Sequence, residues 1–254
     1  MAERDPHSTD SRAPDPREIA AFAAARAELL ERIAAAATHA GRSPGEVALV
    51  AVSKTVPADR LTAAVAAGLP LLGENRVQEA AGKIPLLPGS TWHLLGPLQS
   101  NKARAAAHLF AMVESVDSIA LARRLDRIVG ELADGVGDAR RRLPILLQVN
   151  VDRDDRKAGF EPGDLPAALD GLAGLEGIDV RGLMTVGRLV GSAEEARPTF
   201  AALRELATTL RAAGHPLGPE LSMGMSADYE VAIEEGSTFV RVGRALFGAR
   251  PPVA

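Results

Sequence analysis

Val47-Ala48-Leu49-Val50-Ala51-Val52-Ser53-Lys54 is the stretch of sequence that decides the fold. Its first six residues are all apolar, which is typical of a strand buried on both faces in a parallel sheet. In α/β proteins the active-site residues follow the carboxyl ends of such strands, and Lys54 stands at that end. Partial burial disfavours a charged amine and favours the neutral form that attacks an aldehyde. A lysine that only reaches toward solvent is the commoner structural case, so position alone assigns Lys54 no function.

The rest of the chain repeats this pattern of a short apolar strand followed by a helix. We expect strands at residues 47–54, 71–74, 92–96, 112–116, 143–151, 180–186, 221–225 and 239–242. We expect helices at residues 58–67, 101–107, 118–132, 164–172, 193–213 and 228–235, and a further helix that follows the second strand and ends at residue 83. Residues 245–247 run on after the last strand. About eight strand–helix units predict a single (β/α)8 barrel of the TIM type, a fold of about 250 residues. A doubly wound open sheet is the alternative, but it would more naturally carry a glycine-rich dinucleotide motif after its first strand.

Two segments precede the predicted barrel. Residues 1–16 are polar and proline-bearing and lack the apolar core of a signal peptide, so we expect a disordered tail. Residues 17–40 are rich in alanine, carry apolar residues near helical spacing and end at Gly41, which predicts an extra N-terminal helix on the outside of the barrel. No break in composition follows this helix. We therefore expect a tail at 1–16 and one domain at 17–254.

Composition excludes several classes of protein. The 254 residues are 46% hydrophobic but only 3% aromatic, so Ala, Val, Leu and Ile must fill the core. The net charge of −4 gives no general attraction to nucleic acid or anionic membranes, and no stretch approaches the ~18 apolar residues that span a bilayer. Cysteine is absent, which excludes disulfides and thiolate chemistry, and the five histidines lack metal-ligand spacing. We expect a cytoplasmic protein with no metal, nucleic-acid or membrane partner.

Two loops near the C-terminus suit a phosphate group. Residues 221–226 and 240–245 span the ends of the seventh and eighth predicted strands and the loops that begin there, where barrels often bind phosphate. Gly243 allows close approach of the backbone, and Ser222 or Ser226 can donate a hydroxyl hydrogen bond. Simple turn formation is the structural alternative.

Arg241 lies inside an apolar strand, so its guanidinium needs an acceptor. One interpretation is an internal salt bridge to Glu74 or Glu114, and the other is contact with the ring nitrogen or phosphate of a ligand. An imine-forming lysine and a phosphate site on one barrel rim indicate pyridoxal 5′-phosphate, for which an arginine is a known partner of the pyridine nitrogen.

The chain resembles the pyridoxal phosphate homeostasis proteins, whose barrel is similar to the N-terminal domain of bacterial alanine racemase. The resemblance extends from about residue 47 to residue 250. It rests on seven segments in order: Val52–Thr55, Gly73–Glu79, Trp92–Lys102, Gln148–Val151, Arg181–Thr185, Leu221–Ser226, and Arg241–Gly243 with Phe247-Gly248.

The resemblance implies a cofactor bound covalently to Lys54 as a Schiff base, no catalytic residue and no metal. The other implied pocket residues are Asn75, His93, Met184, Ser222, Ser226, Gly243, Arg244 and, near the pyridine nitrogen, Arg241. Of these, Ser222, Gly243 and the backbone of Arg244 are expected to hold the phosphate, with Ser226 a weaker candidate. The structural alternative for His93 is a satisfied core histidine.

The resemblance also implies a non-catalytic protein that carries and buffers pyridoxal phosphate for vitamin B6 and amino-acid homeostasis, with apoenzymes as recipients. Alternatives are a pyridoxal-phosphate-dependent amino-acid racemase of fold type III, a Schiff-base aldolase without cofactor, and a scaffold protein. In alanine racemase the second acid/base group is a tyrosine from an additional β domain of the partner subunit. Here the one tyrosine, Tyr229, lies in a predicted helix and is not placed over the cofactor, so we expect no catalysis. Because the racemase dimer relies on the additional domain, for which we see no counterpart in this sequence, we also expect a monomer. Lys157, in the charged loop 152–159, is interpreted as a solvated residue, with a transient second imine site as the alternative.

Overall fold

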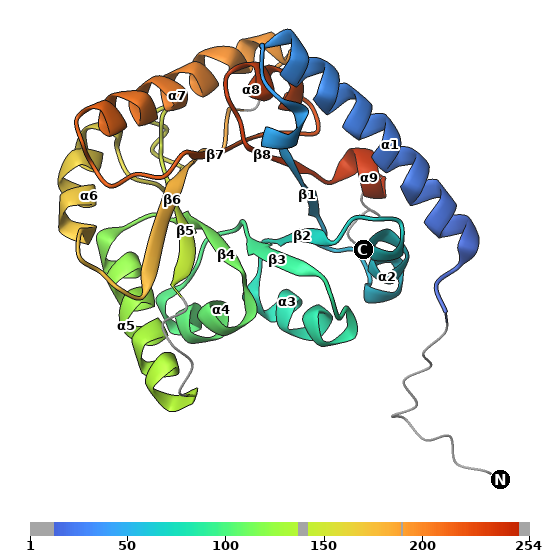
Figure 1. The fold of residues 1–254 in the computed structure, drawn as a ribbon, viewed down its shortest axis with the longest axis horizontal. Coiled ribbons are helices and arrows are strands. Elements are labelled where there is room, and N and C mark those ends of the chain that lie inside the picture. The colour runs from blue at the N-terminus through green and yellow to red at the C-terminus, as the bar shows by residue number, and fades with distance from the viewer. Residues whose placement is uncertain (1–12, 137–141, 189, 249–254) are drawn as a thin grey trace.

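A closed barrel of parallel strands forms the body of the protein (Figure 1). The computed structural model describes residues 13–136, 142–188 and 190–248. The strands are β1 (Ala48–Val52), β2 (Leu71–Glu74), β3 (Thr91–Leu94), β4 (Met112–Val116), β5 (Leu143–Gln148), β6 (Ile178–Met184), β7 (Glu220–Met225) and β8 (Phe239–Val242). The helices are α1 (Pro16–His39), α2 (Ala58–Ala66), α3 (Val77–Lys83), α4 (Ala103–Leu109), α5 (Ile119–Val136), α6 (Leu165–Leu172), α7 (Arg197–Ala212), α8 (Tyr229–Glu234) and α9 (Arg244–Phe247). Short 3-10 turns are η1 (Pro44–Glu46), η2 (Ile84–Leu86), η3 (Ser100–Lys102), η4 (Pro162–Asp164) and η5 (Glu194–Ala196).

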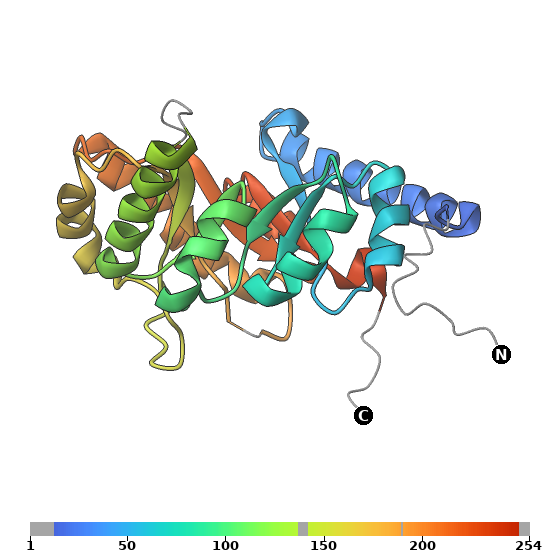
Figure 2. The ribbon, with the colours of Figure 1, turned by 90° about the horizontal axis from the view of Figure 1, so that it is seen from below.

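The predicted (β/α)8 barrel is confirmed by the pairing of its first and last strands. Residues Ala48 to Ala51 of β1 pair in parallel with Phe239 to Val242 of β8, which closes the sheet and excludes an open doubly wound one. Because every strand is parallel, all carboxyl ends meet at one rim. Figure 2 shows the loops that follow β5 and β6 projecting on the same side as α9.

The predicted N-terminal helix is confirmed as α1, which lies along the outside of the barrel (Figure 1). The side chain of Asp15 caps it by accepting a hydrogen bond from the backbone N–H of Arg17 at 2.9 Å. The face that carries Phe22, Leu29 and Ile33 is buried, and α1 contacts α2, α8 and α9. Residues 1–12 of the expected tail lie outside the described residues.

Several predicted element ends differ from the structure by a few residues. The fifth strand ends at Gln148, because Asn150 exchanges hydrogen bonds with the backbone of Asp154 and turns the chain. The predicted helix at 193–213 begins only at Arg197, after a 3-10 turn. Pro198 lacks an N–H group and fits the first turn of a helix, which sets this start.

The barrel interior combines a small apolar cluster with polar side chains. Met112, Leu146 and Met184 form a buried cluster with Phe239, separate from the large core between the strands and the helices. The ring of Phe239 meets the ring of His93 edge to face at 5.5 Å, which joins β8 to β3 across the interior. The interior is therefore filled by side chains, and it also holds the buried polar residues His93, Glu114, Ser222 and Arg241.

Candidate functional site

Lys54 lies at the carboxyl end of the barrel, two residues after β1. It is half-buried, whereas Ser53 before it is fully buried and Thr55 after it is exposed. The sequence predicts a lysine at the carboxyl end of the first strand, and in the structure Lys54 lies there.

The end of β8 lies beside the end of β1, and β7 is the next strand beyond β8. A side-chain carbon on Gly243 would sit 3.2 Å from the carbonyl oxygen of Val52, so the two backbones approach closely here. The N–H of Gly243 donates to the hydroxyl of Ser226 at 3.3 Å. Arg244 begins α9, where its backbone N–H points out of the helix start. These donors suit an anionic group such as a phosphate, and Lys54 follows Val52 by two residues.

A chain of hydrogen bonds crosses the barrel interior below this rim. Arg241 donates to the hydroxyl of Ser222 at 2.6 Å and to the carbonyl of Thr185 at 2.8 Å. Ser222 in turn donates to the carboxylate of Glu114 at 2.5 Å, and Glu114 is bonded to Nδ1 of His93 at 2.7 Å. Burial lowers the pKa of Arg241, and the charge of Glu114 opposes that effect. One interpretation of the sequence was a direct salt bridge between Arg241 and Glu114. In the structure the hydroxyl of Ser222 lies between them, so the two charged groups are linked through it.

The two candidate phosphate serines therefore occupy different environments. Ser222 lies within β7, is fully buried and has its hydroxyl engaged by the interior chain. Ser226 follows β7 and lies against Gly243. Ser226 thus lies at the rim, whereas the hydroxyl of Ser222 is engaged inside the barrel; the expected phosphate contacts of both serines stay predictions.

The remaining predicted pocket residues come from three strands of the same barrel. Asn75 directly follows β2 and is half-buried, and its N–H donates to the carboxylate of Glu74 at 3.2 Å. His93 in β3 is buried and held by Glu114. Met184 ends β6 and belongs to the apolar cluster inside the barrel. The structure thus places Met184 and His93 in the interior and Asn75 at the rim.

An ionic group beside Lys54 was not anticipated from the sequence. Lys83, near the end of α3, pairs with Glu74 at 2.7 Å and with Glu79 at 2.6 Å. Burial raises the pKa of Glu74, and the hydrogen bond from Lys83 opposes that effect. The sequence feature that could have indicated this ionic group is the i,i+4 spacing of Glu79 and Lys83, close after Glu74 at a strand end.

Lys157 lies in a loop that is tied to its neighbour. Its amine donates to Asp152 at 3.1 Å and to the carbonyl of Val186, after β6, at 3.0 Å. In the same loop, a hydrogen bond from Arg156 lowers the pKa of Asp154 to about 2. The amine of Lys157 therefore joins two loops at the rim rather than standing fully in solvent.

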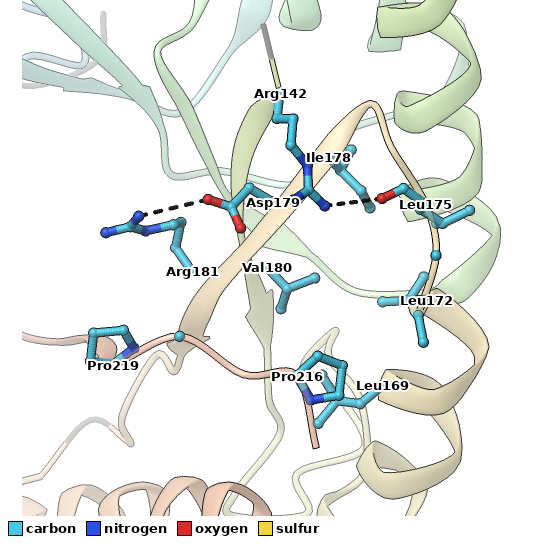
Figure 3. Close-up of a pocket in the computed structure, with 13 residues that line it drawn as sticks. Arg142, Leu169, Leu172, Leu175, Ile178, Asp179, Val180, Arg181, Pro216 and Pro219 are labelled. Atoms are coloured by element: carbon cyan, nitrogen blue, oxygen red, sulfur yellow. Dashed lines mark hydrogen bonds and ion pairs between the residues drawn. The ribbon is translucent and has the colours of Figure 1, made fainter. Parts of the chain in front are cut away.

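A hollow of about 300 Å³ lies at the opposite end of the barrel (Figure 3). Its lining includes Ile178 and Asp179 at the start of β6 and Arg142 just before β5. Arg142 donates to the carbonyl of Leu175 there at 3.0 Å. This end of a barrel serves mainly stability, so the hollow is not the candidate site.

Among residues 13–136, 142–188 and 190–248, no three histidine, aspartate or glutamate side chains form a group that could hold a metal ion. None of the helices in these ranges is long and apolar enough to cross a membrane.

Comparisons with known proteins agree with this architecture. The model of the family "alanine racemase, N-terminal domain" matches residues 17–251. The pyridoxal phosphate homeostasis protein of Pseudomonas aeruginosa is 44% identical over 231 residues, which cover 88% of this chain and 94% of that protein. The protein of the same name from Escherichia coli K12 is 39% identical over 234 residues, covering 88% and 94%.

A solved structure extends the comparison to three dimensions. PipY of Synechococcus elongatus, solved with PLP bound, superposes with a TM-score of 0.73 at 45% identity, covering 86% of this chain and 99% of that one. The chain therefore belongs to the alanine racemase N-terminal domain family and, within it, to the pyridoxal phosphate homeostasis proteins.

Proposed function

We propose that this chain binds pyridoxal 5′-phosphate covalently on Lys54 and carries it for other proteins. The observation that carries the proposal is the close approach of Gly243 to Val52, two residues before Lys54. It brings a primary amine and a set of anion donors to the ends of neighbouring strands, which are about 4.8 Å apart in a sheet. The names of the curated relatives and the PLP-bound PipY structure support the same ligand.

The residues at the rim fit this ligand by their chemistry. The hydroxyl of Ser226 and the backbone N–H groups of Gly243 and Arg244 would hold the phosphate, because all three are donors. A side-chain carbon at position 243 would lie 3.2 Å from the carbonyl oxygen of Val52, so the glycine relieves a tight contact at the end of β1. When bound, pyridoxal phosphate supplies an aldehyde that an amine captures reversibly and a ring that withdraws electrons.

The interior chain of hydrogen bonds would support the ring of the ligand. Arg241 can only donate, so it favours an unprotonated ring nitrogen and a weak electron sink. The hydroxyl of Ser222 accepts a hydrogen bond from the guanidinium of Arg241, and Glu114 in turn holds that hydroxyl. The pocket would be completed by Asn75, His93 and Met184. A weak electron sink suits storage of the cofactor better than proton abstraction from an amino acid.

The position of Tyr229 supports a carrier rather than a racemase. The ring of this tyrosine is 2% exposed and lies under the guanidinium of Arg32 at 5.4 Å, between α8 and α1 on the outside of the barrel. A two-base racemase needs a second acid/base group over the cofactor, and Tyr229 does not supply it. Apoenzymes that need pyridoxal phosphate are the proposed recipients, and a racemase of fold type III remains the alternative function.

Two measurements test the proposal. The purified chain mixed with pyridoxal phosphate should gain absorbance near the visible edge, and the Lys54→Ala variant should not. The loaded chain should transfer the cofactor to an apoenzyme but should not exchange the Cα hydrogen of L- or D-alanine for deuterium. Racemisation at rates typical of enzymes would favour the alternative function.

A further inference from the structure

Three ionic side chains fix the backbone on both sides of Lys54. They are Glu74 at the end of β2, and Glu79 and Lys83 in α3; we call them the ionic triad. None of them belongs to the proposed ligand site.

Lys83 joins the triad to the residue before Lys54. Its amine donates to Glu74 at 2.7 Å, to Glu79 at 2.6 Å and to the carbonyl oxygen of Ser53 at 2.9 Å. These three contacts use all three donors of an ammonium group. The side chain of Lys83 is 10% exposed and that of Glu74 is fully buried, so the contacts are protected from water. Glu74 also accepts a hydrogen bond from the hydroxyl of Ser53 at 2.8 Å.

Glu79 joins the triad to the residue after Lys54. Its carboxylate accepts a hydrogen bond from the backbone N–H of Thr55 at 2.6 Å. Partial burial raises the pKa of Glu79, but the hydrogen bonds from Lys83 and from Thr55 outweigh it, so the pKa lies below its ordinary value. The acceptor is therefore a charged oxygen, which binds an N–H more strongly than a neutral one.

Thr55 adopts a backbone conformation that its side chain disfavours. Its φ is +66°, in the left-handed region, where a β-branched residue is an outlier. Such a conformation persists only when its surroundings impose it, and it occurs most often at functional sites. Thr55 is exposed, so packing does not impose this conformation. The N–H of Val56 donates to the carbonyl of Ser53 at 3.0 Å and closes a turn in which Thr55 is the third residue, and the hydrogen bond to Glu79 holds the N–H of Thr55 within that turn.

We infer that the ionic triad is a positioning device for Lys54. Lys83 and Glu74 hold Ser53, and Glu79 holds the left-handed turn at Thr55, so that the intervening lysine side chain leaves the backbone in one direction. This inference rests on the proposed role of Lys54 as the residue that captures pyridoxal phosphate. The triad residues are positioning residues, because they contact the backbone around Lys54 rather than the ligand.

The test compares three variants of the full chain with the wild type. Glu79→Ala removes the acceptor of the Thr55 N–H. The double variant Glu79→Ala with Thr55→Asn also lacks the acceptor, but places at position 55 a residue that adopts the left-handed region more readily than threonine. Glu131→Ala is the control, because Glu131 also forms an i,i+4 ion pair, with Arg127, but lies on α5, away from Lys54.

Two quantities are measured for each variant. The first is the rate constant of pyridoxal phosphate capture, from the rise in absorbance. The second is the rate of hydrogen–deuterium exchange at residues 53–56 without ligand. Glu79→Ala should slow capture by about tenfold or more, since misplacement of a reacting group by about 1 Å can cost 10²-fold, and should speed exchange. Thr55→Asn should recover part of both changes, and Glu131→Ala should match the wild type.

The result that would overturn the inference is a Glu79→Ala variant with the capture rate and exchange rate of Glu131→Ala. Slow capture without any recovery by Thr55→Asn would also overturn it. If Glu79→Ala does not fold, Glu79→Gln replaces it, with smaller changes in the same direction expected. A wild-type chain that captures no pyridoxal phosphate would refute the proposed function alone, because the exchange measurement still tests the triad.

Discussion

Replacing Lys83 by methionine should destabilise the protein strongly, and more at neutral pH than at acidic pH. Lys83→Met keeps a long apolar side chain but removes the amine that pairs with Glu74 and Glu79. Glu74 is fully buried, so it would keep a charge without its cationic partner. Breaking a buried ion pair by removing one partner costs about 3–5 kcal/mol. For a domain of this size that lowers the melting temperature by about 6–20 °C.

The pH dependence follows from the pKa of Glu74. Burial already raises this pKa, and loss of the Lys83 hydrogen bond, which lowers it, would raise it further. A carboxyl whose pKa is higher in the folded than in the unfolded state favours folding below the unfolded pKa, and this advantage is lost as pH rises through the folded pKa. The destabilisation of Lys83→Met relative to wild type should therefore shrink as the pH falls toward the ordinary carboxyl range.

Urea unfolding of both proteins at about pH 7.5 and about pH 5 measures this difference in the free energy of unfolding. A loss below about 1 kcal/mol at the higher pH, as for a surface pair, would refute the account of Lys83 as a buried partner. An equal loss at both pH values would refute the assignment of the effect to Glu74.

Three further changes are predicted, each followed by chemical denaturation. Gly96→Ala should cost about 1–3 kcal/mol, because the new carbon would sit 2.2 Å from the carbonyl oxygen of Asn75; an unchanged unfolding midpoint would contradict this contact. Ser222→Ala should cost about 1–3 kcal/mol, because it removes the hydroxyl that links Arg241 to the buried carboxylate of Glu114; an unchanged free energy of unfolding would argue against this network of hydrogen bonds. Tyr229→Phe should leave stability unchanged or raise it by up to about 1 kcal/mol, because among the described residues its buried hydroxyl has no hydrogen-bond partner; a clear loss would reveal one.

The barrel could be predicted from the sequence because its signals are local. Short apolar runs such as Met112–Val116 and Phe239–Val242 coincide with the observed strands, and the glycines after the predicted helices mark where the chain turns. The position of Lys54 on the rim follows from the same pattern, since the end of a parallel strand fixes which rim a residue occupies.

The parts of the site that the sequence did not predict depend on contacts between distant residues. Ser222 and Ser226 were both candidate phosphate donors, and the predicted strand at 221–225 already contained Ser222; what the sequence did not show is that its hydroxyl is engaged by Glu114 and Arg241 inside the barrel. Its partner Glu114 is 108 residues away in sequence, on a strand that is not adjacent in the barrel. No local pattern encodes such a pair.

The ionic triad was missed for a related reason. Glu79 and Lys83 are four residues apart on α3, a spacing that is common for exposed ion pairs, and only the tertiary structure brings Lys83 against the buried carboxylate of Glu74. Tertiary packing here overrides the local preference of charged side chains for solvent.

The most direct test of the central claim is to identify the residue that captures pyridoxal phosphate. The purified chain is mixed with pyridoxal phosphate, reduced with borohydride, digested and mapped by mass spectrometry. The account predicts one dominant modified peptide, with the pyridoxyl group on Lys54. Modification mainly at another lysine, or none above that of an unrelated protein treated in the same way, would contradict it.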